Sequence, residues 1–224
     1  MRKMGKTVRF YYVRHGKTLF NRLGRMQGWC DAPLEEEGIA QAYAAKEALK
    51  DVPFDRAYTS TSERCVDTAH IVLEGRDVPL TYTKLLKEMF WGDYEGARDV
   101  EYPEEIKRRR FGNADWSDCG GENLQMLKER VLKIYGQIYD ESNDGDNVLI
   151  VSHGAIFMHM VQLVFGLNRK YMYQLMDEHG EKMHPITHGY AGIFEIQDGE
   201  YRLLQLNGHY DGFLDDLKAY GTGE

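Results

Sequence analysis

Segments typical of buried strands alternate with helical segments along this chain, and no other feature constrains its fold as strongly. Residues 8–13 (VRFYYV), 54–60 (FDRAYTS) and 146–154 (DNVLIVSHG) are rich in β-branched and aromatic residues, as buried strands are. Apolar residues at helical spacing predict the helices 33–49, 62–75, 123–141 and 155–167. Because strands linked through helices pair in parallel, we expect a mostly parallel sheet with helices on both faces.

The later part of the chain adds elements of a different kind. Residues 192–206 predict a β-hairpin around Asp198-Gly199, which places an antiparallel pair at one edge of the sheet. Residues 89–122 show weaker periodicity, and we expect a helical insertion there. A length of 224 residues suits one α/β domain with such an embellishment. We therefore predict a single three-layer α/β/α domain over residues 1–224.

Charge and cysteine content limit the partners of the protein and its compartment. A formal net charge of -8 argues against nucleic acid or an anionic membrane as a partner, so an anionic substrate needs a locally positive pocket. Three cysteines without a C-x-x-C pair indicate neither a disulfide scaffold nor a zinc site. The N-terminus fits neither a signal peptide nor a membrane span. We expect a cytoplasmic protein, and the sequence predicts no oligomeric state.

Two of the predicted strands run directly into a His-Gly dipeptide. The first gives Arg14, His15 and Gly16, and the second gives His153 and Gly154. In open α/β sheets, ligands bind beyond the carboxyl ends of the strands. We therefore expect the two imidazoles to face each other at that edge, where each glycine lets the backbone turn sharply and approach a ligand.

Two further charged residues complete a set suited to phosphoryl chemistry. Arg64 lies in the first turn of the helix after the second strand, and Glu88 follows the segment KLLK. Guanidinium groups bind phosphoryl oxygens bidentately, a neutral imidazole can attack phosphorus, and a carboxyl group can protonate the departing oxygen. The sequence contains no carboxylate–histidine pattern typical of a metal site, so we predict neither a metal nor a cofactor.

The motifs around these residues resemble those of one family. VRHGKTLFN resembles the R-H-G-x-T-x-x-N signature of histidine phosphatases, the phosphoglycerate mutase-like superfamily. Further motifs of that family are matched, in the same order, by QGWCDAPLEEEGIAQA, STSERCVDTA, KEMFWGDYEG, GGEN and VSHG. The matches extend from Val13 to Gly154, which is most of the chain, and their combination is highly specific.

This resemblance implies a role for each residue of the set. It implies that His15 is the nucleophile that becomes phosphorylated and that Glu88 is the proton donor. It also implies that the phosphoryl group is bound by Arg14, Arg64 and His153. Further substrate-binding positions are implied at Asn21, Gln27, Gly28 and Gly154. The implied activity is metal-independent hydrolysis of a small phosphorylated metabolite. The alternatives are phosphoglycerate mutase-type transfer and a protein that binds a phosphorylated ligand without turnover.

Several positions depart from the family pattern. Lys17 stands where the signature often has Glu or Gln, Asn123 replaces the serine of G-E-S, and His188 stands where relatives often have Asn. Phosphoglycerate mutases of this superfamily follow the acid with E-R-H-Y-G and carry a longer insert. Here Glu88 is followed by MFWG, which favours a hydrolase.

The predicted insertion contains the basic run 107–110 (KRRR). We expect this run to be a solvated helix face, with contact to an acidic leaving group as the alternative. Trp91 and Trp116 are expected either to pack or to line an apolar part of the pocket. His159 is expected to be a partly buried helix residue. A structural or surface position is expected for His70, His179, His184 and His209.

Overall fold

A mixed sheet forms the centre of the protein, which is described by a computed structural model over residues 5–112, 114–181 and 186–220. Within these residues the strand order is β3-β2-β4-β1-β5-β6. The strands are β1 (Thr7–Arg14), β2 (Arg56–Ser60), β3 (Leu80–Thr83), β4 (Asn147–Ser152), β5 (Gly189–Gln197) and β6 (Glu200–Leu206). His184, for which a structural or surface position is expected from the sequence, lies outside the described residues.

The pairing of the strands confirms the predicted topology. β1, β4, β2 and β3 pair in parallel, whereas β5 pairs with β1 and β6 pairs with β5 in the antiparallel sense. Asp198 and Gly199 connect β5 to β6 with φ angles of 53° and 87°. Positive φ at both central residues is typical of the tight turns that match the twist of a hairpin. The hairpin begins at Gly189, three residues before the predicted start.

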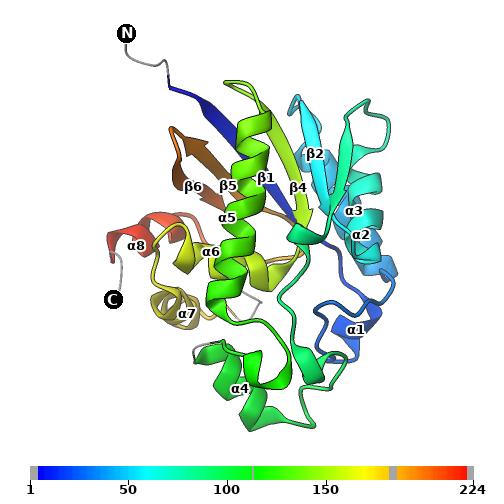
Figure 1. The fold of residues 1–224 in the computed structure, drawn as a ribbon, viewed down its shortest axis with the longest axis vertical. Coiled ribbons are helices and arrows are strands. Elements are labelled where there is room, and N and C mark those ends of the chain that lie inside the picture. The colour runs from blue at the N-terminus through cyan, green and yellow to red at the C-terminus, as the bar shows by residue number, and fades with distance from the viewer. Residues whose placement is uncertain (1–4, 113, 182–185, 221–224) are drawn as a thin grey trace.

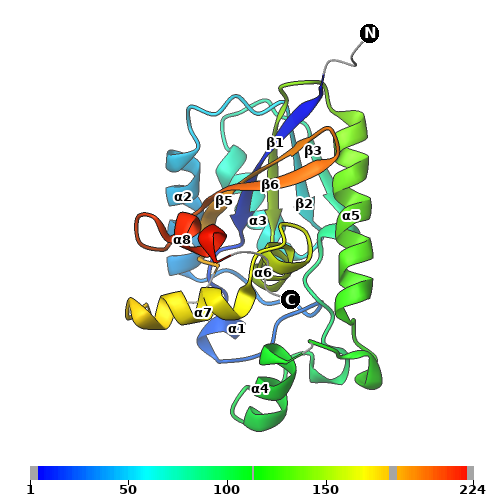
Figure 2. The same cartoon turned by 90° about the vertical axis from the view of Figure 1, so that its left-hand side faces the viewer.

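Helices cover both faces of this sheet (Figures 1 and 2). α2 (Glu36–Ala48) and α3 (Glu63–Leu73) cover one face, and α5 (Leu124–Glu141) and α6 (Gly154–Leu163) cover the other. The α/β/α architecture is therefore confirmed. α8 (Phe213–Ala219) lies beside the hairpin, and α7 (Arg169–Glu178) packs next to α6 and α8. α1 (Leu19–Arg22) follows the first His-Gly loop.

The side chains of β1 show how the sheet is buried on both faces. Phe10 and Tyr12 belong to the core cluster that includes residues of α5 and α6, whereas Tyr11 and Val13 belong to the cluster that includes residues of α2 and α3. Successive side chains of a strand point to opposite faces, so a strand covered on both sides is apolar throughout. Ile39 is an exception to the predicted helix pattern, because it is 40% exposed on α2.

The segment 89–122 contains one regular helix, α4 (Pro103–Phe111), flanked by the 3-10 turns η2 (Gly92–Tyr94) and η3 (Ser117–Cys119). Figure 1 shows α4 beyond the carboxyl ends of the parallel strands. The segment therefore reaches over the edge of the sheet at which the two His-Gly dipeptides lie.

The basic run in α4 has three different environments. Arg108 is exposed and pairs with Glu105, as expected of a solvated face. Arg109 contradicts that expectation, because it is 6% exposed and forms an ion pair with Asp118 at 2.6 Å. Its guanidinium carbon also lies 5.3 Å from the centre of the Trp116 ring. Arg109 therefore holds the segment together, and Arg110 is the member of the run that lines a cavity.

The structure also bears on the cysteines and on membrane-spanning helices. Cys30, Cys65 and Cys119 are free thiols. Among the described helices, none is long and apolar enough to cross a lipid bilayer.

Candidate active site

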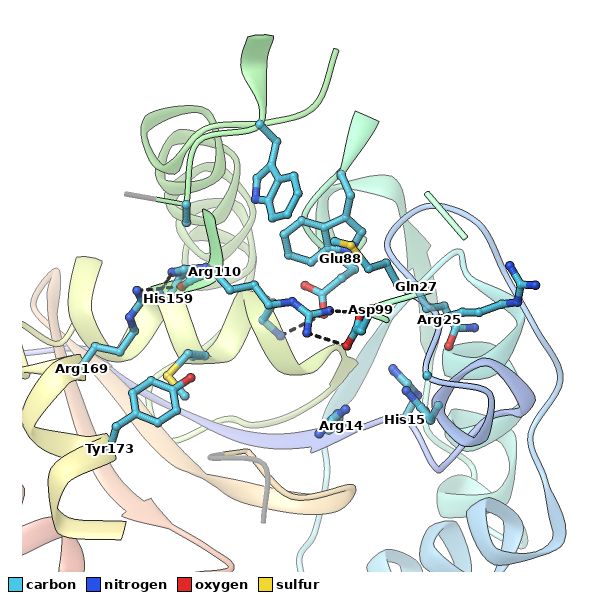
Figure 3. Close-up of a pocket in the computed structure, with 18 residues that line it drawn as sticks. Arg14, His15, Arg25, Gln27, Glu88, Asp99, Arg110, His159, Arg169 and Tyr173 are labelled. Atoms are coloured by element: carbon cyan, nitrogen blue, oxygen red, sulfur yellow. Dashed lines mark hydrogen bonds and ion pairs between the residues drawn. The ribbon is translucent and has the colours of Figure 1, made fainter. Parts of the chain in front are cut away.

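A cavity of about 360 Å³ opens at the carboxyl ends of β1 and β4 (Figure 3). The segment 19–27, the insertion 89–122 and helices α6 and α7 contribute to its wall. Four arginines and two carboxylates line it: Arg14, Arg25, Arg110, Arg169, Glu88 and Asp99. The cavity is thus a local positive region in an acidic protein, as an anionic ligand requires.

His15 lies at the end of β1, is 3% exposed and lines the cavity. Its Nδ1 atom lies 2.9 Å from the carbonyl oxygen of Gly16. A carbonyl oxygen only accepts hydrogen bonds, so Nδ1 carries the proton and Nε2 keeps its lone pair. Burial, together with the charges of Arg64 and Arg14, holds the pKa of His15 well below its usual 6.5. The imidazole is therefore neutral at physiological pH, with Nε2 available as a nucleophile.

Arg14 precedes His15 and is also buried, at 7% exposure. Its Nη1 donates to the carbonyl oxygen of Ile186 at 2.5 Å, and its Nε has no partner among the described residues. Burial lowers the pKa of Arg14 to about 10, partly offset by the nearby charge of Glu88. The guanidinium therefore stays charged at neutral pH.

Arg64 and His153 lie together beside His15, and neither lines the cavity. The ring centres of His15 and His153 are 5.3 Å apart, so the two imidazoles face each other as predicted. Arg64 Nη2 lies 2.9 Å from His153 Nδ1. Because a guanidinium only donates, Nδ1 accepts and the Nε2–H of His153 donates to Ser60 Oγ at 2.8 Å.

The protein itself supplies a negative charge beside Arg64. Arg64 is fully buried, and its Nη1 forms an ion pair with Asp31 at 2.8 Å. Its Nη2 also donates to the carbonyl oxygen of Gly28 at 2.8 Å. The Nε of Arg64 has no partner among the described residues. The guanidinium is thus fixed in place with one donor to spare.

Glu88 lines the cavity and caps the start of α6. Its carboxylate accepts the backbone N–H groups of Met89, Ala155 and Ile156, each at 2.9 Å. Burial raises the pKa of Glu88 above its usual 4.5, and these hydrogen bonds oppose the rise. A raised pKa suits a group that has to donate a proton.

The three residues predicted from the first loop have different positions. Asn21 and Gln27 line the cavity, and both bond to the buried Thr18. The Nε2 of Gln27 is buried and has no partner among the described residues. Gly28 does not line the cavity, because its carbonyl binds Arg64 and its amide donates to Glu95 at 3.3 Å.

Both glycines of the His-Gly dipeptides make close contacts within the protein. A Cβ on Gly154 would lie 2.9 Å from Arg14 Nε. A Cβ on Gly16 would lie 2.1 Å from the carbonyl oxygen of Gly38 on α2. Gly154 thus lies close to the side chain of Arg14, and Gly16 lies close to the backbone of α2.

Buried donors without a partner occur in and beside this cavity. Among the described residues, the buried donors without a partner include Arg14 Nε, Gln27 Nε2, Arg64 Nε and Trp116 Nε1. Leaving a buried N–H unpaired costs about 1–3 kcal/mol, so an acceptor that reaches these groups gains that energy. All four are N–H groups, which an oxyanion would satisfy.

Sequence reasoning assigned no role to His188, which nevertheless contacts the candidate nucleophile. Its Nδ1 donates to the carbonyl oxygen of His15 at 2.8 Å, and the two ring centres are 5.6 Å apart. The signal was present, because His188-Gly189 is another His-Gly dipeptide at a strand end. β5 is antiparallel to β1, so its beginning lies at the edge where β1 ends.

Two helices contribute lining residues that the sequence analysis also missed. His159 lies on a helix as expected, but it is more deeply buried than predicted, at 5% exposure, and it lines the cavity. Ala155, Met158 and His159 follow the i, i+3, i+4 spacing of one helix face. Arg169 and Tyr173 follow the i, i+4 spacing on α7. Glu88 fixes the start of α6, so this face turns toward the cavity.

A buried ion pair holds the loop that carries Glu88. Arg130 on α5 pairs with Glu122 at 2.8 Å. Arg130 also donates to the backbone carbonyls of Lys87 and Glu88, at 2.6 and 3.2 Å. Asn123, at the position of the family serine, accepts the Met126 amide and caps α5. Within the described residues, no group of three or more histidine, cysteine, aspartate or glutamate residues could hold a metal ion.

Comparisons with known proteins agree on one family. The model of the "Histidine phosphatase superfamily (branch 1)" matches residues 10–206. An adenosylcobalamin/alpha-ribazole phosphatase of Salmonella typhimurium is 36% identical over 159 residues, which cover 69% of this chain and 78% of that protein. A 2,3-bisphosphoglycerate-dependent phosphoglycerate mutase 2 of Gloeobacter violaceus is 36% identical over 163 residues, 67% of this chain and 74% of that protein.

A solved structure shows the same fold. The crystal structure of a phosphoglycerate mutase from Bacillus anthracis superposes with a TM-score of 0.73 at 25% identity. The superposition covers 90% of this chain and 93% of that one. The relatives thus include both phosphatases and mutases, at equal identity in the two curated cases.

Proposed function

Since the chain belongs to the histidine phosphatase superfamily, we propose that it hydrolyses small phosphomonoesters through a phosphohistidine formed on His15. The observation that carries this proposal is the neutral imidazole of His15, whose Nδ1 donates to Gly16 and leaves Nε2 free at the cavity wall. Arg14 and Glu88 line the same cavity. We expect the protein to act in the cytoplasm on a small phosphorylated metabolite.

The first step transfers the phosphoryl group to the protein. The Nε2 lone pair of His15 forms a bond to phosphorus while the bond from phosphorus to the leaving oxygen breaks. Glu88 gives its proton to that oxygen. Arg14 and Arg64 offer their unpartnered Nε–H groups to the phosphoryl oxygens, where charge develops. His153 joins them when its Nε2–H turns from Ser60 to the phosphoryl group.

The second step releases inorganic phosphate. Water attacks phosphorus, the bond from phosphorus to Nε2 breaks, and Glu88 takes a proton from the water. His15 returns to its neutral form and Glu88 to its acid form. Asn21 and Gln27 supply donors at the rim, and Gly28 contributes indirectly by binding Arg64 through its carbonyl.

Gly154→Ala tests whether the position of Arg14 matters for phosphate binding. The added methyl group would lie 3.0 Å or less from Arg14 Nε and Cζ, so the guanidinium must move. We expect the affinity for inorganic phosphate to fall about tenfold or more, the size of a charge-assisted hydrogen bond. Titration calorimetry measures this affinity.

Gly136→Ala provides the matched control. A Cβ on Gly136 in α5 would meet nothing within 4 Å, so alanine should stabilise the protein by about 0.5–1 kcal/mol without changing phosphate affinity. Unchanged affinity in Gly154→Ala would mean that Arg14 does not contact the phosphate.

Phosphate release from p-nitrophenyl phosphate in excess EDTA tests the proposed function directly. We expect turnover that EDTA does not reduce, because in the proposed reaction Arg14 and Arg64 supply the positive charge at the phosphoryl oxygens. Loss of turnover on chelation would refute the metal-independent reaction. Binding of inorganic phosphate without turnover would instead support a protein that only binds phosphorylated ligands.

Mutase-type transfer is the second candidate, and the mutase relative at 36% identity favours it. It requires return of the phosphoryl group to a bound acceptor. An assay with 3-phosphoglycerate and a bisphosphate primer separates the two reactions. Formation of the 2-isomer faster than release of phosphate would replace hydrolysis by the mutase reaction.

A further inference from the structure

A second set of polar side chains lines the end of the cavity away from His15. Helices α6 and α7 place His159, Arg169 and Tyr173 there, and Figure 3 shows Arg169 and His15 on opposite sides of the cavity. Arg110 lies between these sides in the same view. The proposed hydrolysis uses none of these side chains.

Arg169 is a buried cation without a carboxylate partner in the described part of the chain. Arg169 is only 8% exposed. Its Nη2 donates to the backbone carbonyls of Arg110 and Gly112 at 3.0 and 3.4 Å, and its Nη1 lies 3.3 Å from His159 Nδ1. Arg110 differs, because Asp99 binds both of its terminal nitrogens at 3.0 and 3.2 Å.

An unneutralised guanidinium is costly to bury, and the two carbonyl oxygens at the end of α4 carry only partial negative charge. Burial disfavours the charged form and lowers the pKa of Arg169. His159 carries no negative charge and accepts from Arg169 through Nδ1, so its Nε2 holds a proton and is a second donor. Burial and the charge of Arg169 hold the pKa of His159 at about 3, so the ring stays neutral.

Apolar side chains lie beside the charged ones along the cavity wall. Trp91, Trp116 and Met158 line the cavity along with the charged residues. The two indole rings meet edge to face with their centres 5.0 Å apart. These side chains can contact the uncharged part of a ligand that carries an anionic group at each end.

We propose that Arg169 and His159 form a second anion subsite, which selects phosphomonoesters whose leaving group carries another oxyanion, either a carboxylate or a second phosphate. This inference rests on the proposed function, because it takes the end at His15 as the phosphoryl site. Arg169 donates to the second oxyanion and receives the counter-charge that the described protein residues do not give it. His159 donates through Nε2–H.

Two series of phosphonates test the subsite on the wild-type protein by titration calorimetry. Linear alkylphosphonates are compared with ω-carboxyalkylphosphonates of the same chain length, and with the corresponding alkylene bisphosphonates. For at least one chain length we expect the second acid to tighten binding about tenfold or more, the size of a charge-assisted hydrogen bond. The better of the two acidic series identifies the second group as a carboxylate or a phosphate.

Substitution of Arg169 tests whether the preference for a second acid comes from the subsite. In Arg169→Met the advantage of the second acid should disappear, while affinity for the plain alkylphosphonate stays within about threefold of wild type. Lys170→Met is the matched control, since it removes one positive charge from the adjacent, exposed position on α7. It should keep the advantage, which would exclude a general effect of net charge.

The outcomes separate this inference from the proposed function. Equal affinity of the acidic and plain phosphonates at every chain length in the wild-type protein would overturn the subsite, even if p-nitrophenyl phosphate is hydrolysed. A clear preference for the second acid without any hydrolysis would keep the subsite and refute the phosphatase. If Arg169→Met does not fold, equal affinity of the two kinds of phosphonate for the wild-type protein still overturns the subsite.

Discussion

His15→Asn is expected to abolish phosphate release, with kcat falling by roughly 10³-fold or more. Asparagine can place its amide N–H where Nδ1 of His15 donates to Gly16, so the local backbone should be kept. It lacks the second nitrogen, which is the group that attacks phosphorus in the proposed reaction. Turnover of p-nitrophenyl phosphate in EDTA measures the loss.

Covalent labelling gives a second readout of the same substitution. Brief reaction of the wild-type protein with a ³²P-labelled phosphomonoester should leave an acid-labile label, and His15→Asn should show none. His70→Asn is the control, because His70 is exposed on α3 and its side chain bonds to Tyr82 among the described residues. Turnover that survives in His15→Asn would show that another group attacks phosphorus.

Glu88→Gln is expected to lower kcat for an alkyl phosphomonoester by roughly 10²–10⁴, the usual contribution of a positioned acid. The loss should be much smaller for p-nitrophenyl phosphate, whose leaving group departs without a proton. The amide also places an NH2 group where the carboxylate accepts N–H groups at the start of α6. Thermal unfolding is therefore measured alongside the rates, to separate a loss of stability from a loss of acid catalysis.

The pH dependence of kcat/KM tests whether the protonated form of Glu88 is the active one. The first step needs Glu88 protonated, so kcat/KM should fall as the pH rises through its raised pKa. The corresponding limb for His15 lies well below pH 6.5, because burial lowers its pKa. The alkaline limb should disappear in Glu88→Gln and persist in Asp99→Asn, which changes the other carboxylate of the cavity. An unchanged profile in Glu88→Gln would assign the proton to another group.

The sequence predicted the sheet well, because local patterns decide it. A strand that is apolar on both faces, like β1 with Phe10, Tyr11, Tyr12 and Val13, has to be covered on both sides. The helices between the strands supply that cover and make the central pairs parallel. The position of His15 and His153 at one edge then follows, since parallel strands end on the same side.

The sequence could not predict the contacts that give each side chain its chemistry. Arg108, Arg109 and Arg110 are adjacent, yet one is solvated, one is buried against Asp118 and one lines the cavity. Nothing in the sequence shows which groups bind the imidazole of His153. In the structure Arg64 donates to its Nδ1, and its Nε2–H donates to Ser60. These partners come from residues that are remote along the chain, and only the packed fold brings them together.

By itself, therefore, the sequence determined the family, the α/β/α architecture and the edge of the sheet where the chemistry is expected. Only the tertiary structure decided which nitrogen of His15 is free, and that Arg169 enters the same cavity from α7. The physical reason is that periodicity along a chain fixes which face of an element is buried. Hydrogen-bond partners and unpaired charges depend instead on how distant elements meet.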